Sequence, residues 1–281
     1  MKFDKLTYTL GEMMGPPQKL TIQSDGEVRY ESHSNISMPD RPEIGFYETR
    51  LSSADIERLQ RGMASPPFEG FPDHWGRIAS GDRYKRISVA IGSQMIEKMV
   101  GTREPVDPSL ATLIAQLDQI VATVMAHPRR TLRIEVSHMS LDDSRKLTVD
   151  FALSNGGTEI TESRNPVGLL AASGLSIRGW PDKPPAQFRS GEAFSVHVEN
   201  VTEIGKSPSE AAAPTILTIG PADKVTFRAL ARLSAPGPQT YIVQLAYQNT
   251  AEEPGRPSLM IGELFSRSGK LSVPAAKMPD R

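Results

Sequence analysis

Beyond about Leu132, apolar residues of this 281-residue chain alternate with polar ones, and clear helix signals disappear. A period of two places successive side chains on opposite faces of a β-strand. The alternating runs are short and are separated by turn residues, for example at 155–157, 181–185 and 236–238. About seven or eight such strands with turns between them are typical of a β-sandwich. We therefore expect an all-β sandwich domain over residues 131–281.

The first part of the chain mixes strand and helix patterns. Residues 19–32 alternate on either side of Asp25-Gly26, a pair that indicates a tight hairpin turn because glycine accepts a positive φ. A third strand is expected over 46–51 and a second hairpin over 86–100.

Two helices are predicted in the same part. Ser52 is a suitable N-cap for a short helix, and Asp107 followed by Pro108 is a suitable start for a longer one. The apolar residues of the longer helix recur at helical spacing: Leu110, Leu113, Ile114, Leu117, Ile120, Val121 and Val124. Such a stripe needs an apolar surface to cover. We expect residues 1–128 to form an α+β domain in which this long helix covers a small antiparallel sheet.

The charge of the chain argues against one class of partner. There are 32 Lys and Arg residues against 33 Asp and Glu residues. Neither half has the basic excess that neutralises nucleic-acid phosphates. We therefore expect no nucleic-acid partner.

The chain contains no cysteine, which excludes disulfides and thiolate chemistry. The N-terminal residues lack the apolar core of a secretory signal, and polar residues interrupt the apolar-rich stretch 110–125. These features predict a cytoplasmic protein that crosses no membrane. No two of the five histidines stand at a metal-ligand spacing, so neither a metal nor a cofactor is expected.

His74 is the best single candidate for a general base. It stands in the segment Phe71-Pro72-Asp73-His74-Trp75, where a loop histidine between an acid and an aromatic ring could take a proton or contact a ligand. The alternative is that the aromatic residues anchor a long connection and that Asp73 and His74 are solvated.

Other features that resemble catalytic sites fail on spacing or on their place in a strand. Gly262 to Lys270 has six residues between its glycines, where a phosphate loop needs four. Gly174 to Gly179 has one residue too many for a nucleophile elbow. Alternation places His197 on the solvent face of its strand. No catalytic residue is assigned.

Two stretches rich in Met, Pro and aromatic residues, at 13–17 and 63–75, are candidate partner-binding loops. Flexible Met side chains and aromatic rings suit adaptable protein contacts. The candidate contact residues are Met13, Met14, Phe68, Phe71, His74 and Trp75. The alternative is that these side chains close the core of a small domain.

The strands of the C-terminal half carry a resemblance to a known kind of domain. Residues 241–247 read Y-x-V-x-L-x-Y after a Gly-Pro turn, and residues 262–266 read G-E-L-x-S. Residues 147–155 read L-x-V-x-F-x-L-x-N. These patterns resemble the strands of bacterial immunoglobulin-like sandwich domains. The resemblance implies an immunoglobulin-like sandwich over residues 131–281 and says little about function.

The first half is similar to small bacterial domains of uncharacterised or immunity-protein type. The similarity lies in I-x-S-D-G-x-V-x-Y at residues 22–30 and L-S-S-A-D-I-E-R-L at residues 51–59. It implies a non-enzymatic protein-binding module, most concretely a bacterial immunity or inhibitor protein that neutralises a cognate toxin or effector. The alternative is a hydrolase-like enzyme with its site in an inter-domain cleft near His74.

Overall fold

The structure is a computed structural model that describes residues 1–12, 17–35, 41–64, 67–78, 82–101, 106–168, 174–184, 187, 191–205, 214–233, 237–249 and 255–274. The chain packs as two compact units. Unit 1 consists of Met1–Ser34 and Gly45–Arg130, and unit 2 consists of Asn35–Ile44 and Thr131–Arg281. Two segments of the chain therefore belong to unit 2. The first is short and lies within the N-terminal half, and the second begins at Thr131.

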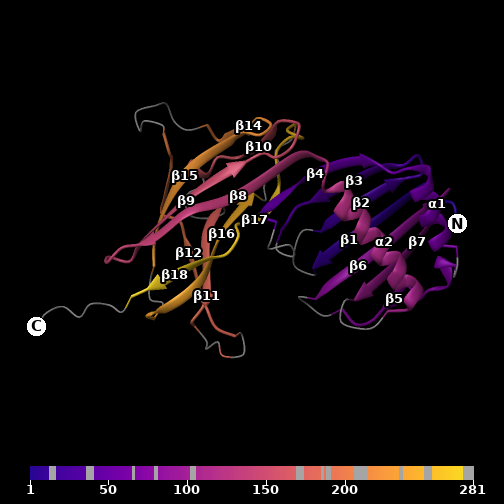
Figure 1. Ribbon diagram of the computed structural model, residues 1–281, viewed down its shortest axis with the longest axis horizontal. Helices are drawn as coiled ribbons and strands as arrows, with labels where there is room; N and C mark the ends of the chain where they lie inside the picture. The colour runs from indigo at the N-terminus through magenta and orange to yellow at the C-terminus, as the bar shows by residue number, and fades with distance from the viewer. Residues whose placement is uncertain are drawn as a thin grey trace, which may run out of the picture. The chain divides into compact units, whose positions relative to one another are not determined.

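Unit 1 contains one large sheet with two α-helices on it (Figure 1). The strands and helices are β1 Lys5–Glu12, β2 Gln18–Gln23, β3 Glu27–Ser32, β4 Glu43–Arg50, α1 Ser53–Gly62, the 3-10 helix η1 Phe68–Gly70, β5 His74–Trp75, β6 Arg83–Ile91, β7 Gln94–Gly101 and α2 Pro108–Val124. The strand order is β4-β3-β2-β1-β6-β7-β5, antiparallel except for the parallel pair β5 and β7.

Strand β1 joins the two predicted hairpins into this sheet. It pairs with β2 on one side and with β6 on the other. Tyr8 stands opposite Leu20 and Ile87, and all three side chains are fully buried. A second buried row, Ile22, Leu6 and Val89, lies beside the first. These rows provide the apolar surface that the stripe of α2 requires.

Both predicted helices are present, with the predicted N-caps. The Ser52 Oγ accepts a hydrogen bond from the Asp55 N–H at 3.2 Å, and the Asp107 carboxylate accepts one from the Ser109 N–H at 2.8 Å. The turn at Gly26 has φ +91°, and an added Cβ there would stand 2.7 Å from the Leu51 carbonyl oxygen. Among the described residues, no helix has the length and hydropathy needed to cross a membrane.

Unit 2 is built from strands, apart from the 3-10 helix η2 Pro166–Gly168, over the residues that the structure describes. The strands are β8 Pro128–Leu141, β9 Lys146–Ser154, β10 Thr161–Arg164, β11 Leu175–Pro181, β12 Phe194–His197, β13 Asn200–Glu203, β14 Ile216–Ile219, β15 Lys224–Arg232, β16 Gln239–Asn249, β17 Gly262–Phe265 and β18 Gly269–Val273. Strands β13-β15-β9-β8 lie in one sheet, β12-β11-β16 in another with β17 and β18 both paired to β16, and β10-β14 form a short ribbon.

The core of unit 2 comes from the alternate side chains of its longest strands. Residues of β9 alternate between buried and half-buried along its length, and those of β11 do the same. Phe151 and Phe227 stand opposite each other on β9 and β15, with stacked rings 5.3 Å apart. A cross-strand aromatic pair of this kind adds about 0.5–1.5 kcal/mol to the burial of its two rings.

The predicted fold class, an α+β domain with a small sheet covered by a long helix followed by an immunoglobulin-like sandwich, is wrong. The described residues are mostly β, with two α-helices among them. Unit 1 alone carries seven of the described strands. The prediction missed β1, although Leu6, Tyr8 and Leu10 alternate along it. Without β1 the two hairpins are separate small sheets, and the long helix is large in proportion to either of them.

The Asn35 side chain bonds to the backbone of β17 at Phe265, as a neighbouring strand would. Its amide nitrogen donates to the Phe265 carbonyl at 2.7 Å, and its amide oxygen accepts from the Phe265 N–H at 2.7 Å. The same amide nitrogen donates to the Arg41 carbonyl at 3.0 Å. Asn35 is 2% exposed, so these bonds lie away from bulk water.

We expect Asn35→Ala to lower the free energy of unfolding by about 2–3 kcal/mol, because it leaves the buried N–H and carbonyl of Phe265 unpaired. Urea denaturation followed by circular dichroism measures the change. Asn200→Ala, at an exposed position of β13, is the matched control and should alter stability by less than about 0.5 kcal/mol. Equal effects of the two substitutions would contradict the role given to Asn35.

Candidate functional site

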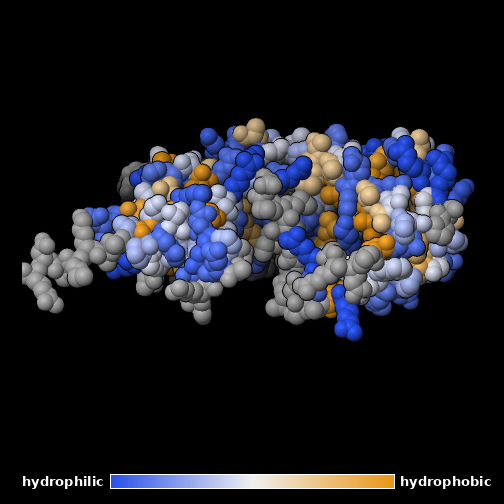
Figure 2. All heavy atoms as spheres, turned by 60° about the horizontal axis from the view of Figure 1, so that its bottom comes forward, coloured by the Kyte–Doolittle hydropathy of each residue, from blue (hydrophilic) through white to orange (hydrophobic). Residues whose placement is uncertain are grey.

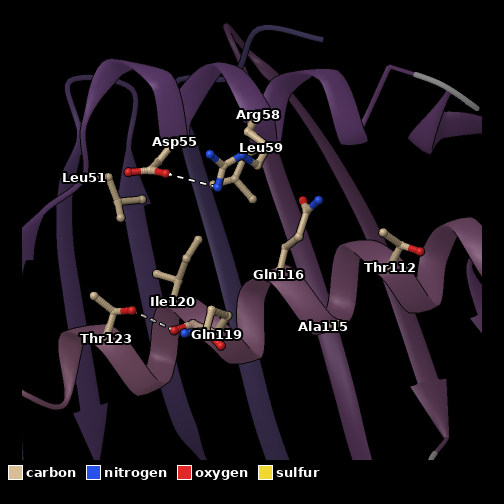
Figure 3. A pocket seen from close by; sticks show the side chains of 10 residues that line it. All are labelled: Leu51, Asp55, Arg58, Leu59, Thr112, Ala115, Gln116, Gln119, Ile120 and Thr123. Carbon is tan, nitrogen blue, oxygen red and sulfur yellow. Dashed lines mark hydrogen bonds and ion pairs between the residues drawn. The ribbon is translucent and has the colours of Figure 1, made fainter.

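A groove of about 390 Å³ lies between α1 and α2 in unit 1 (Figure 3). Its lining residues are Leu51, Asp55, Arg58, Leu59, Thr112, Ala115, Gln116, Gln119, Ile120 and Thr123. The two helices run side by side in opposite directions, with strands behind them, and Leu59, Gln116 and Ile120 lie between them. This volume falls within the range of about 300–1,000 Å³ that is usual for ligand sites.

The N-cap of α1 positions the charged end of the groove. The Ser52 hydroxyl donates to Asp55 Oδ2 at 2.6 Å, and this hydrogen bond lowers the pKa of the Asp55 carboxyl. One turn later Arg58 lies 3.4 Å from the same carboxylate. Among the lining residues, Asp55 and Arg58 are the only charged ones, and they pair with each other.

The wall formed by α2 is neutral. Thr112 donates its hydroxyl to the Pro108 carbonyl at 2.8 Å, and Thr123 donates to the Gln119 carbonyl at 3.0 Å. Because these hydroxyl protons are used within the helix, the threonines contribute mainly their methyl groups to the surface. With Ala115 and Ile120, they make this wall apolar, interrupted by two glutamine amides.

The outer face of α2 continues this neutral surface. Its exposed residues are Ala111, Thr112, Ala115, Asp118, Gln119, Ala122 and Thr123. Asp118, the one charge among them, accepts from Tyr8 at 2.6 Å and from Lys85 at 2.7 Å. Burial raises the pKa of Tyr8, which keeps its hydroxyl a proton donor. In the space-filling view, hydrophobic residues reach the surface of unit 1 among hydrophilic ones (Figure 2).

Gln116 carries an unsatisfied acceptor at the bottom of the groove. Its Oε1 atom is buried and accepts no hydrogen bond from the part of the chain that the structure describes. It faces the end of α1, where an added Cβ at Gly62 would stand 3.3 Å away. A buried carbonyl without a donor destabilises the fold by about 1–3 kcal/mol. Replacing this side chain by an apolar one should therefore stabilise the chain.

We expect Gln116→Leu to raise the free energy of unfolding by about 1 kcal/mol, because the substitution removes the unpaired carbonyl and adds apolar contacts. Chemical denaturation checks the sign. The same substitution at the exposed Gln119 is the control and should change stability by less than about 0.5 kcal/mol. A destabilised Gln116→Leu variant would contradict this view of the groove.

The residues that the sequence proposed for partner binding differ in how exposed they are, where the structure describes them. Met13 and Met14 lie outside the described residues. Phe68 is fully buried in η1, with its ring 6.4 Å from that of Phe71 in an edge-to-face contact. Phe68 therefore presents no surface to a partner. Phe71 and Trp75 are half-buried and His74 is exposed.

Asp73 is engaged by a buried lysine. Lys98, whose side chain is 4% exposed, donates to Asp73 Oδ1 at 2.8 Å, to the Glu69 carbonyl at 3.2 Å and to the Phe71 carbonyl. The hydrogen bond from Lys98 lowers the pKa of Asp73. All three ammonium protons are thus used to hold the loop before β5. Asp73 therefore holds this loop through Lys98, with its own side chain 79% exposed.

We expect Lys98→Met to lower the free energy of unfolding by about 2–3 kcal/mol, because charge-assisted bonds to two loop carbonyls are lost. Asp73→Asn should destabilise the chain less than Lys98→Met does, since this carboxylate is 79% exposed and the carbonyl bonds persist. Urea denaturation of both variants measures which one loses more free energy of unfolding. A larger loss for Asp73→Asn would contradict this expectation.

A second hollow of about 420 Å³ lies beside this lysine and includes Glu69, Asp73, His74, Met95 and Glu97. Met95 is 63% exposed. No group of three or more His, Asp or Glu side chains within the described ranges is placed to hold a metal ion. In unit 2, His197 is exposed at the end of β12, as its alternation predicted.

The sequence analysis did not identify the groove. It placed Ile120 only in the buried stripe of the longer helix. The available signal was compositional, because a solvated helix face normally carries charges, whereas the outer positions of α2 are mostly Ala, Thr and Gln. The position of α1 beside this face was not predictable from either helix alone.

No protein-family model and no curated protein sequence matches the chain. A solved structure described as "AvmM Catalyzes Macrocyclization in Alchivemycin A Biosynthesis" is similar over 53% of this chain and 91% of its own length. The identity is 9% and the TM-score is 0.29. A similarity at that TM-score carries no argument about the fold or activity of this chain.

Proposed function

We propose that this chain is a non-enzymatic protein-binding module and that the groove between α1 and α2 is its binding site. The observation that supports this most is the lining of the groove. It is largely apolar and neutral, and its one ion pair is internal. Such a surface is suited to covering apolar side chains of a partner, and it offers no pair of groups for proton transfer.

The resemblance of the N-terminal half to immunity-type domains supports a more specific form of this function. In that form the chain is a bacterial inhibitor that binds a cognate toxin or effector. The cysteine-free composition supports a cytoplasmic location for it. The partner is then a protein rather than a nucleic acid, because acidic and basic residues are balanced.

The hydrolase alternative is not proposed. His74 is exposed, and Asp73, the carboxylate beside it in sequence, is bonded to Lys98.

A photo-crosslinking amino acid at Gln119 in the native host, compared with one at Ala122, tests the site. Both positions are exposed on α2, but only Gln119 lines the groove. We expect an adduct from Gln119 alone, and mass spectrometry identifies the protein. The purified partner is then titrated against the wild-type chain by calorimetry.

We expect Ala115→Glu to weaken binding of this partner by about tenfold or more, because a carboxylate would be buried without a partner in the interface. Ala122→Glu is the matched control, because each new glutamate lies within one turn of Asp118 and is equally compatible with a helix. The control should bind within about twofold of wild type. Equal affinity of all three proteins would exclude the groove as the site.

A further inference from the structure

The hydrophobic core of unit 2 is incompletely covered along part of β8. Ile134, Val136 and Met139 stand opposite alternate residues of β9, all of which are fully buried. Directly opposed residues share a face of the sheet, so these three side chains of β8 point toward the core. Ile134 is fully buried, whereas Val136 and Met139 are only half-buried. The row of core residues therefore becomes exposed to water beyond Ile134.

This exposure begins where the neighbouring strand of β8 ends. The Ile134 N–H donates to the carbonyl of Pro42, just before β4, at 3.0 Å. From Pro42 the chain runs back along β8, since the Glu48 N–H donates to the His127 carbonyl at 3.2 Å. Within the described ranges, no strand lies beside residues 135–139 on the side away from β9.

The backbone of β8 also faces this open side. Alternate residues of a strand direct their N–H and carbonyl groups to the same side. Because the β9 partners of Ile134, Val136 and Met139 are alternate residues, all three direct these groups away from β9. Ile134 meets Pro42 there, but the other two find no backbone partner in the part of the chain that the structure describes. An extended neighbour satisfies such groups, because its own N–H and carbonyl groups recur at the same spacing.

A hollow of about 370 Å³ lies along the open side of β8. Residues 134–137 and Met139 line it on one side, with Pro42 beside Ile134. Residues 267–270, which lead into β18, form the other wall. The whole lining belongs to unit 2. From Ile134 to Met139 the open edge is about 17 Å long, which is enough for a segment of about five extended residues.

A second copy of this chain does not fit this edge with its own β8. Each copy carries the wall 267–270 beside its edge, so the basic side chains of the two walls would meet. The register of β8 also shifts between Val136 and His138, and such a bulge bends the strand. The hollow therefore suits one extended segment rather than the edge of a second sheet.

The charge of the hollow favours an acidic residue on that segment. Arg267 and Lys270 are exposed in the wall, and Glu135 is the one acidic residue among the described lining residues. Glu135 pairs with Arg133 at 2.7 Å, and Lys270 pairs with Asp182 at 2.7 Å. With these partners included, three basic side chains stand against two acidic ones.

We propose that this hollow binds an extended segment of a partner protein, which adds to the sheet beside β8. The segment presents apolar side chains at i and i+2 next to Val136 and Met139, and it carries an acidic residue toward the wall 267–270. Main-chain hydrogen bonds provide the affinity, and the alternate side chains provide the specificity. This site is separate from the groove between α1 and α2 and does not depend on the function proposed for it.

Designed peptides of about eight residues test the proposal with the full chain. The first alternates valine with threonine and ends in aspartate. A control of the same composition has its valines adjacent to one another. Two further forms of the first peptide are N-methylated, one at the valines and the other at the threonines. Because only one of these two sets of N–H groups can face β8, one methylated form should bind and the other should not.

Amide hydrogen exchange and fluorescence anisotropy measure the binding. We expect the amides of Val136 and Met139 to exchange rapidly in the free chain and about tenfold or more slowly with the alternating peptide. Met139→Glu should weaken binding about tenfold or more, because a carboxylate would be buried without a partner. Ser140→Glu, on the opposite face of β8, is the matched control and should bind within about twofold of wild type. Ala115→Glu should also bind the peptide as wild type does.

Several outcomes overturn the proposal. Slow exchange of both amides in the free chain would show that the chain covers its own edge. Protection that rises with the concentration of the chain would show that a second copy covers it. Failure of the alternating peptide to bind, equal binding of the control peptide, or equal binding of the two methylated forms would exclude strand addition. A missing crosslink at Gln119 would instead count against the groove alone.

Discussion

The burial of two cross-strand rows beneath α2 determines the rest of unit 1. Strand β1 contributes Leu6 and Tyr8 to these rows, and its neighbours on both sides complete them. The stripe of α2 covers this surface, and the Tyr8 hydroxyl bonds to Asp118 on the helix. Once α2 is placed, α1 lies beside it on the same sheet, and the space left between the helices becomes the groove.

Buried polar side chains of this chain differ in how many of their hydrogen bonds are made. Lys98 uses all its protons to hold a loop, and Asn35 replaces a strand neighbour through paired bonds to Phe265. Each of these side chains stabilises its surroundings because every bond is made. Gln116 is the contrast, since its buried oxygen has no donor among the described residues. This oxygen is one of several buried polar atoms without a partner in the described residues, and it belongs to a residue that lines the groove.

Local patterns predicted local elements well. These elements are the Asp25-Gly26 turn, the two hairpins and the N-caps Ser52 and Asp107. They depend on interactions within a few residues, so the sequence alone predicts them. The fold class was wrong because it depends on which strands meet. The pairing of Asp73 with Lys98 was not predictable for the same reason, since Lys98 is 25 residues away in the chain and its approach follows from the pairing of β5 with β7.

By itself the sequence determined the balanced charge, the absence of thiol chemistry, the positions of both helices and the alternation that makes the C-terminal half β-stranded. Only the tertiary structure decided that β1 unites the hairpins, that Phe68 is hidden and that two helices form the walls of a groove. The physical reason is how far apart in the sequence the interacting residues are. Turns, caps and alternation arise from neighbours along the chain, whereas a groove exists only when surfaces distant in sequence pack beside each other without filling the space between them.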